Sequence, residues 1–232
     1  MVVSRDSADG GDSGSFLRRA KAVFAQAAAR LRLRRETGPI DTVEALVYFA
    51  HTRAAFVGQK KLYGYLKARM GTRYPSMFED EVFVGSINIA KCHVFAACLS
   101  DITVHTVAHV AQAGEMTRDE AGALALRVFS AGLETNRGEL GGEDLLTQWR
   151  EAFLRRLDAT HWENVAAGAD AFTESPAALY RWAPIDEQLK RYDREIVENS
   201  IRFAWAEVIR DCRLRLRPGE VLADMRRAQP EG

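Results

Sequence analysis

Two histidines and an aspartate lie four residues apart inside the most apolar stretch of the chain, residues 78–113. In an α-helix, Asp101, His105 and His109 would share one face, because residues four apart are neighbours on the helix surface. An H-x-x-x-H pair can offer two imidazoles to one divalent metal ion, and a carboxylate one turn earlier can act as a third ligand or orient a histidine. The spacing therefore predicts a candidate divalent metal site at Asp101, His105 and His109.

The alternative for these three residues is structural. Buried polar groups cost free energy unless they are hydrogen-bonded, ion-paired or metal-bound, so the same side chains would also suit a polar network that fixes the core. The sequence favours the network, because it contains no H-E-x-x-H motif, no paired Glu-x-x-His motif and no cysteine cluster.

The remaining candidate metal ligands are more scattered. Asp158 and His161 have i, i+3 spacing near another helix, and His51 lies inside the long helix expected after Asp41. A histidine on one helix with an H-x-x-x-H pair on a later one is similar to the three-histidine site of DinB-like bundles. Only His51 and the pair at 105 and 109 carry this likeness, so we assign no family from it.

The second feature is a basic amphipathic helix expected over residues 16–36, after a disordered tail at residues 1–15. No acidic residue occurs between Ser13 and Arg35, and an apolar stripe runs along the helix between basic side chains. Such a helix is typical of docking on a protein partner or an anionic membrane surface. A peripheral helix docked on the acidic middle of its own chain is the alternative. The predicted docking residues are Phe16, Arg18, Arg19, Lys21, Phe24, Arg30, Arg32, Arg34 and Arg35.

Charge is balanced over the whole chain and uneven along it. The 232 residues carry 32 basic and 32 acidic side chains, which argues against a surface that coats nucleic acid. Residues 1–75 hold 14 basic and 6 acidic side chains, whereas residues 76–178 hold 7 and 16. Bases and tyrosines alternate at residues 59–74, but the tyrosines spread around the helix axis, so we expect them to pack within the fold and nucleic-acid binding to be unlikely.

The three cysteines, Cys92, Cys98 and Cys212, include no C-x-x-C pair. Cys92 and Cys98 lie six residues apart in one expected helix, on different faces and too far apart to bridge. The chain opens with a Ser-, Asp- and Gly-rich stretch without the apolar run of a secretory signal. We therefore expect a cytoplasmic protein, with a peripheral membrane position as the alternative.

Helix signals dominate the rest of the chain. Capping-box patterns at Asp41 with Glu44, Ser76 with Glu79, and Thr117 with Glu120 predict helices that reach about 70, 113 and 133. Further helices are expected at 143–158, 161–167, from Ser175-Pro176, and from Pro184 to about 216, followed by a short one to about 227. Residues 83–89 are ambiguous between helix and strand.

These elements predict an all-α fold, in which residues 37–232 form one helical-bundle domain of about six to eight helices around a buried central helix. The central segment is nearly long enough to cross a membrane, but Asp101 and three histidines would then lie in hydrocarbon, so we expect a core helix. The sequence favours a non-enzymatic interaction, adaptor or regulatory protein. The alternative is a metal-dependent enzyme or small-ligand-binding protein that uses Asp101, His105 and His109.

Overall fold

The computed structural model describes residues 38–228, which belong to one compact unit and are helical almost throughout. The helices of this part are α2 (Val43–Met70), α3 (Glu81–Ala113), α4 (Arg118–Thr135), α5 (Arg137–Leu140), α6 (Glu143–Asp158), α7 (Trp162–Ala166), α8 (Glu174–Trp182), α9 (Glu187–Lys190), α10 (Arg194–Arg215) and α11 (Pro218–Arg227), with short 3-10 turns at Gly71–Arg73 and Ser76–Glu79. The predicted all-α fold is confirmed, and the predicted N-terminal tail and basic helix lie outside the described residues.

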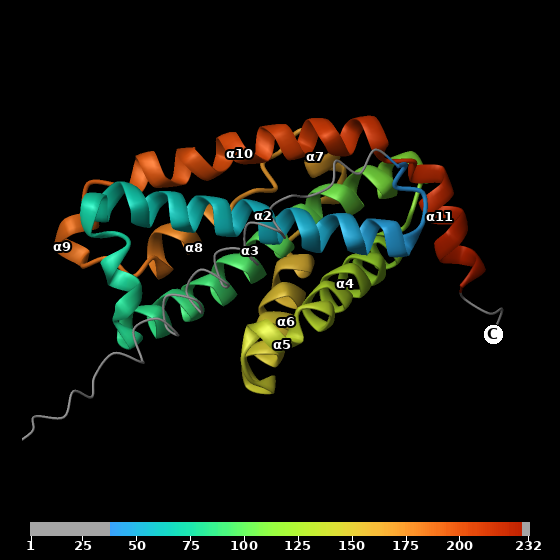
Figure 1. The fold of residues 1–232 in the computed structure, drawn as a ribbon. Helices are drawn as coiled ribbons and strands as arrows, with labels where there is room; N and C mark the ends of the chain where they lie inside the picture. The colour runs from blue at the N-terminus through green and yellow to red at the C-terminus, as the bar shows by residue number, and fades with distance from the viewer. Residues whose placement is uncertain (1–37, 229–232) are drawn as a thin grey trace, which may run out of the picture. The chain divides into compact units, whose positions relative to one another are not determined.

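Helix α3 is the central element of the bundle, and α2, α4, α7, α8 and α11 contact it (Figure 1). Twenty of its residues are buried, on all sides of the helix from Cys92 to Ala111. The ambiguous segment 83–89 is therefore helical. Within residues 38–228, α3 is also the one helix long and apolar enough to cross a membrane. Here its middle is enclosed by other helices, as expected of the core helix of a bundle.

The helix starts agree with the sequence in part. The capping box of Thr117 and Glu120 is formed, with the Thr117 hydroxyl accepting from the Glu120 amide. At α2 the cap is Thr42, because its hydroxyl accepts from the amide three residues on, so the expected cap at Asp41 is wrong by one residue. Ser76 opens only a 3-10 turn, and the Asp80 carboxylate caps α3 instead. Each shift moves the cap to the residue whose oxygen reaches the free amides.

The prediction of one long helix from Pro184 to about 216 is wrong at its start. A separate turn, α9, is capped by Asp186, and the chain then breaks before α10. Asp193 sits at this break, where Arg69 donates to both carboxylate oxygens and the Tyr65 hydroxyl donates to Oδ2 at 2.7 Å. These partners are more than 120 residues away in sequence, so the break depends on tertiary contacts.

Residues at the start of the described chain form hydrogen bonds with residues near its end. Ile40 pairs with Leu216 in an isolated parallel bridge, with the Ile40 amide donating to the Arg215 carbonyl at 2.9 Å. The Val43 amide donates to the Asp224 carboxylate at 3.0 Å. Together these bonds attach α2 to α10 and α11.

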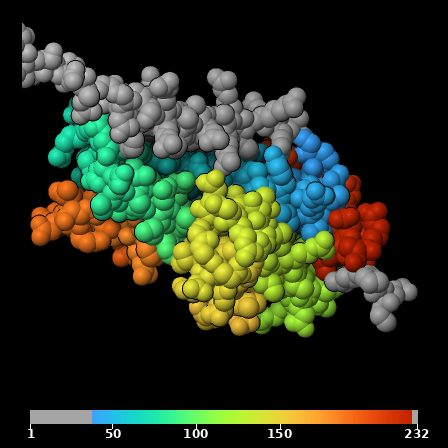
Figure 2. Space-filling model, turned by 60° about the horizontal axis from the view of Figure 1, so that its bottom comes forward, coloured from blue at the N-terminus to red at the C-terminus, as the bar shows by residue number. Residues whose placement is uncertain are grey.

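On another face, α4, α5 and α6 gather into one projecting region (Figure 2).

Candidate functional site

Asp101 is fully buried in the middle of α3, and its carboxylate accepts the hydrogen bonds at the centre of a polar network. Its Oδ1 accepts from Arg156 Nη1 at 2.8 Å, and its Oδ2 accepts from the Ser175 amide at 2.8 Å. The Glu174 amide also donates to Oδ1, at 3.2 Å. Glu174 and Ser175 are the first two residues of α8, whose own cap residue, Thr173, makes no side-chain cap bond. Asp101 therefore supplies the acceptor that the start of α8 lacks.

Arg156, near the end of α6, holds several segments together. Its Nη1 also donates to the Ser100 hydroxyl at 2.7 Å, and its Nη2 donates to the Ala171 carbonyl at 2.6 Å. The network continues through Ser175, whose hydroxyl accepts from Trp205 Nε1 at 3.0 Å. The buried Asp101–Arg156 ion pair and the hydrogen bonds around it thus join α3, α6, α8 and α10.

The charge state of Asp101 reflects opposing influences. Burial raises its pKa to about 6, while the Arg156 guanidinium and the hydrogen bonds from Ser175 hold it down. The carboxylate is therefore ionised at neutral pH and is fully engaged by donors. A carboxylate held in this way positions helices.

The structure does not bring Asp101 together with His105 and His109 as one ligand set, and metal binding at these residues stays a prediction. Within residues 38–228, no group of three or more His, Cys, Asp or Glu side chains is placed to hold a metal ion. The reason is that Arg156 and the start of α8 occupy the Asp101 carboxylate. We expected the two core histidines to be hydrogen-bonded. The Nε2 atom of each ring is instead buried without a hydrogen-bond partner among the described residues.

The His105 and His109 rings instead pack against each other and against Phe172. The two rings meet edge to face, with centroids 4.7 Å apart, and the Phe172 ring lies 5.2 Å from that of His105. Burial lowers the pKa of His105 to about 3, helped by His109 and by Arg213. Burial and Arg213 also lower the pKa of His109. Both imidazoles are therefore neutral at physiological pH.

The other histidines identified in the sequence lie elsewhere. His51 Nδ1 is 3.4 Å from the Asn136 amide nitrogen, between α2 and the end of α4. His161 precedes α7 and lines a pocket of about 550 Å³ at the C-terminal end of α3. Arg118, another lining residue, donates to the Asp158 carbonyl at 2.5 Å. The full lining is Ala111, Gln112, Glu115, Met116, Arg118, Thr160, His161, Trp162, Glu163 and Asn164.

The basic and aromatic segment at residues 59–74 packs into the fold as expected. Tyr63 is half-buried against Phe78, with ring centroids 6.5 Å apart, and Tyr65 bonds to Asp193. All three cysteines are free and buried, and burial raises the pKa of each thiol.

Two charged residues important to the fold, Arg156 and Lys190, were missed in the sequence. Lys190 is 2% exposed, and its Nζ donates to the carbonyls of Tyr180 and Arg181 at 3.2 and 3.3 Å. Arg156 has an indirect signal, because a buried Asp101 requires a cation. Lys190 has none, since its position in a charged stretch resembles that of a solvated side chain.

An exposed apolar stripe on α10 is the clearest surface feature. Ile196, Phe203 and Leu214 are 70%, 78% and 71% exposed, and they fall within about 20° of one another around the helix. Tyr192, in the turn before the helix, is 81% exposed. The opposite side of α10 is the buried one, and it carries Val197, Ile201, Trp205, Val208 and Cys212.

Comparison with protein-family models, curated proteins and solved structures found no match to this chain. The fold and its side-chain contacts are therefore the basis for a functional proposal.

Proposed function

We propose that this protein is a non-enzymatic helical interaction protein that binds its partner through the α10 stripe, defined as Tyr192, Ile196, Phe203 and Leu214. The observation that carries the proposal is the exposure of three large apolar side chains along one line of one helix. Exposed apolar side chains aligned at intervals of two to three helical turns can each anchor a partner helix.

The orientation of α10 supports this proposal. The helix runs along one edge of the bundle, where it contacts α2 and α8 (Figure 1). Trp205 on its inner side is 1% exposed and donates to Ser175, so the rotation of the helix about its axis is fixed. Turning the stripe inward would expose Trp205 and break this bond. The stripe therefore faces outward in the folded protein.

The interior supports a positioning role for the polar residues. Asp101 accepts bonds from Arg156 and from the start of α8, and the neutral histidine pair packs against Phe172. These contacts join helices, and they suit a rigid scaffold that presents a surface. Three free, buried cysteines also fit the expected reducing, cytoplasmic compartment.

The test compares two variants of the full chain. Phe203→Glu places a charge in the stripe, and Val82→Glu places one at an equally exposed position on α3, 78% in both cases. The proposal predicts that the wild type and Val82→Glu capture the same partners, while Phe203→Glu loses them without a change in melting temperature. Equal capture by all three proteins would reject the stripe as the binding surface.

The basic segment at residues 16–36 remains a second docking element in this proposal, for a protein partner or an anionic membrane. Its support is the pattern of bases beside an apolar stripe. A protein truncated before Thr37 should stay folded and lose binding to phosphatidylserine-containing liposomes, and high salt should mimic that loss. Unfolding of the truncated protein, or no liposome binding by the full chain, would contradict this element.

A further inference from the structure

We infer that the α10 stripe binds the same stripe of a second copy of this chain, in an antiparallel arrangement centred on Phe203. This inference rests on the proposed function, because it names the partner of the same surface.

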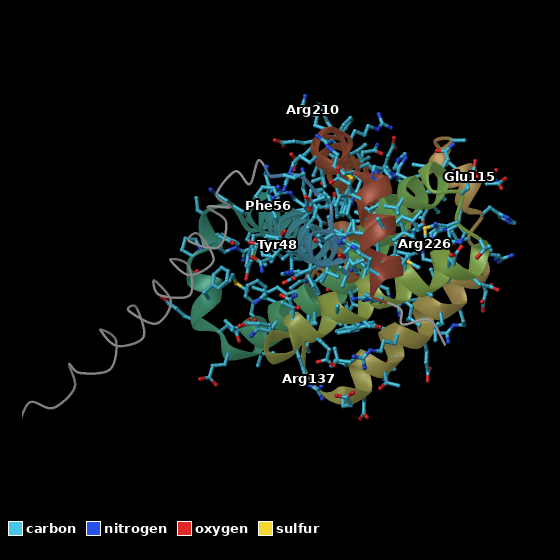
Figure 3. All side chains as sticks on the ribbon, turned by 90° about the vertical axis from the view of Figure 1, so that its right-hand side faces the viewer. Tyr48, Phe56, Glu115, Arg137, Arg210 and Arg226 are labelled. Carbon is cyan, nitrogen blue, oxygen red and sulfur yellow. The ribbon has the colours of Figure 1, made fainter. Side chains whose placement is uncertain are left out.

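The spacing of the stripe is symmetric about Phe203. Ile196 and Arg210 each lie seven residues from it, and Tyr192 and Leu214 each lie eleven residues from it. In an antiparallel pair of helices, Phe203 would meet Phe203 at the twofold axis, and Leu214 would reach the turn that contains Tyr192 before the partner copy's α10. Ile196 would lie along the aliphatic stem of Arg210, which points away from the protein at the outer edge of α10 (Figure 3).

One pair of charges beside the stripe, Glu195 and Arg213, favours the antiparallel direction. Glu195 and Arg213 are 18 residues apart, about five helical turns, so both lie on the same flank of α10. Neither forms an ion pair within residues 38–228. In an antiparallel pair the same flanks meet, and Glu195 of one copy would lie within about 3 Å, along the axis, of Arg213 of the other. In a parallel pair opposite flanks would meet, so Glu195 and Arg213 would not face each other.

The length of the surface sets the strength of the dimer. Helix α10 has 22 residues and is therefore about 33 Å long. One helix pair of this length buries less than the roughly 1,600 Å² of a standard stable interface. We therefore expect a weak dimer whose population depends on protein concentration.

Sedimentation velocity of the full chain over a range of concentrations tests the dimer. The wild type and Val82→Glu should shift from monomer to dimer as concentration rises, and Phe203→Glu should remain monomeric. A wild type that is monomeric at every concentration would overturn the inference. A dimer that persists in Phe203→Glu would also overturn it, because the interface would then lie elsewhere.

A charge exchange tests the register. Glu195→Arg and Arg213→Glu should each weaken the dimer at least severalfold, because each places like charges opposite one another. The double variant should restore it, since the exchanged pair is again complementary. Additive weakening in the double variant would overturn the antiparallel register.

Cysteine cross-linking tests the direction. The native thiols are buried, so a surface cysteine reports its own neighbours. Phe203→Cys should form a disulfide-linked dimer, and Ile196→Cys should do so only when mixed with Arg210→Cys. Efficient self-linking of Ile196→Cys would show a parallel pair and overturn the inference.

These outcomes separate the inference from the proposed function. If the chain is monomeric but Phe203→Glu still loses a captured partner that Val82→Glu retains, only the identity of the partner is wrong. If neither self-association nor capture depends on Phe203, both fail.

Discussion

Asp101 and Lys190 bind opposite ends of the same short helix, α8. The Asp101 carboxylate accepts from the amides of Glu174 and Ser175 at its start, and the Lys190 ammonium donates to two carbonyls at its end. Both side chains are buried. An anion at the N-terminus and a cation at the C-terminus each complement the helix dipole. A nine-residue helix is marginal alone, so these two charges help to hold it against α3.

The first prediction concerns the buried ion pair. Replacing Asp101 by Asn should lower the free energy of unfolding by about 1 to 3 kcal/mol, because Arg156 would lose its buried partner and keep only Glu174, whose carboxylate lies 3.3 Å away and is 42% exposed. Urea unfolding measures this change, with the exposed Asp144→Asn as the matched control. Adding Arg156→Met to Asp101→Asn should recover part of the loss. A fully additive double variant would show that the two side chains are not coupled.

The second prediction concerns the other end of α8. Lys190→Met keeps most of the side-chain volume and removes the bonds to the α8 carbonyls, so we expect a loss of about 1 to 3 kcal/mol. Glu187, its ion-pair partner, is 80% exposed and would not be left as a buried charge. Lys67→Met, at an exposed position, should change stability by less than about 0.5 kcal/mol. Equal effects at the two lysines would contradict a capping role.

The third prediction is a loss of stability in mild acid. The pKa of His105 is lowered from 6.5 to about 3, so below pH 6.5 the unfolded chain binds a proton that the folded chain does not. Stability from this group is complete above pH 6.5 and falls as the pH drops toward 3. Asp101 acts in the opposite direction between about pH 6 and 3.8, because its pKa is raised. The shift of His105 is larger, and those of His109 and His93 have the same sign, so the net effect should be destabilising.

Melting temperatures at pH 7.5 and 5 measure this effect. His105→Leu should show a smaller decrease between the two pH values than the wild type does. An unchanged slope in His105→Leu would show that this imidazole is not buried as described.

The fourth prediction uses two glycines of α4. A Cβ at Gly132 would lie 2.9 Å from Leu99 Cδ2 and 3.4 Å from His51 Cβ, so Gly132→Ala should cost about 1 to 3 kcal/mol. Gly122 has no atom within 4 Å of such a Cβ. Gly122→Ala should therefore stabilise the protein by about 0.5 to 1 kcal/mol through helix propensity. Thermal unfolding that ranks the two variants in the opposite order would contradict the close approach of α3 and α4.

The parts of the fold that depend on local signals could be predicted from the sequence. The all-round apolar segment indicates α3 as the buried centre, and the capping box at Thr117 indicates the start of α4. The break before α10 could not be predicted, because it depends on Asp193 meeting Arg69 and Tyr65 from a distant helix.

The candidate site could likewise be predicted from the sequence only in part. Burial of Asp101 and His105 follows from the apolar pattern around them. Whether Asp101 turns to the histidines or to Arg156 depends on where α6 and α8 pack, and no spacing within α3 contains that information. The α10 stripe was also missed, because α10 carries apolar residues on two sides and the sequence does not show which side is buried.

Side-chain oxidation footprinting tests the central claim, that the α10 stripe is a binding surface, most directly. Tyr192 and Phe203 are 81% and 78% exposed, so hydroxyl radicals should modify both readily in dilute protein. With increasing concentration of the chain, or on addition of a captured partner, we predict that both become protected while Tyr48, 45% exposed on α2, keeps its rate. Unchanged modification of Tyr192 and Phe203 in the bound state, or protection of Tyr48 alone, would contradict the account.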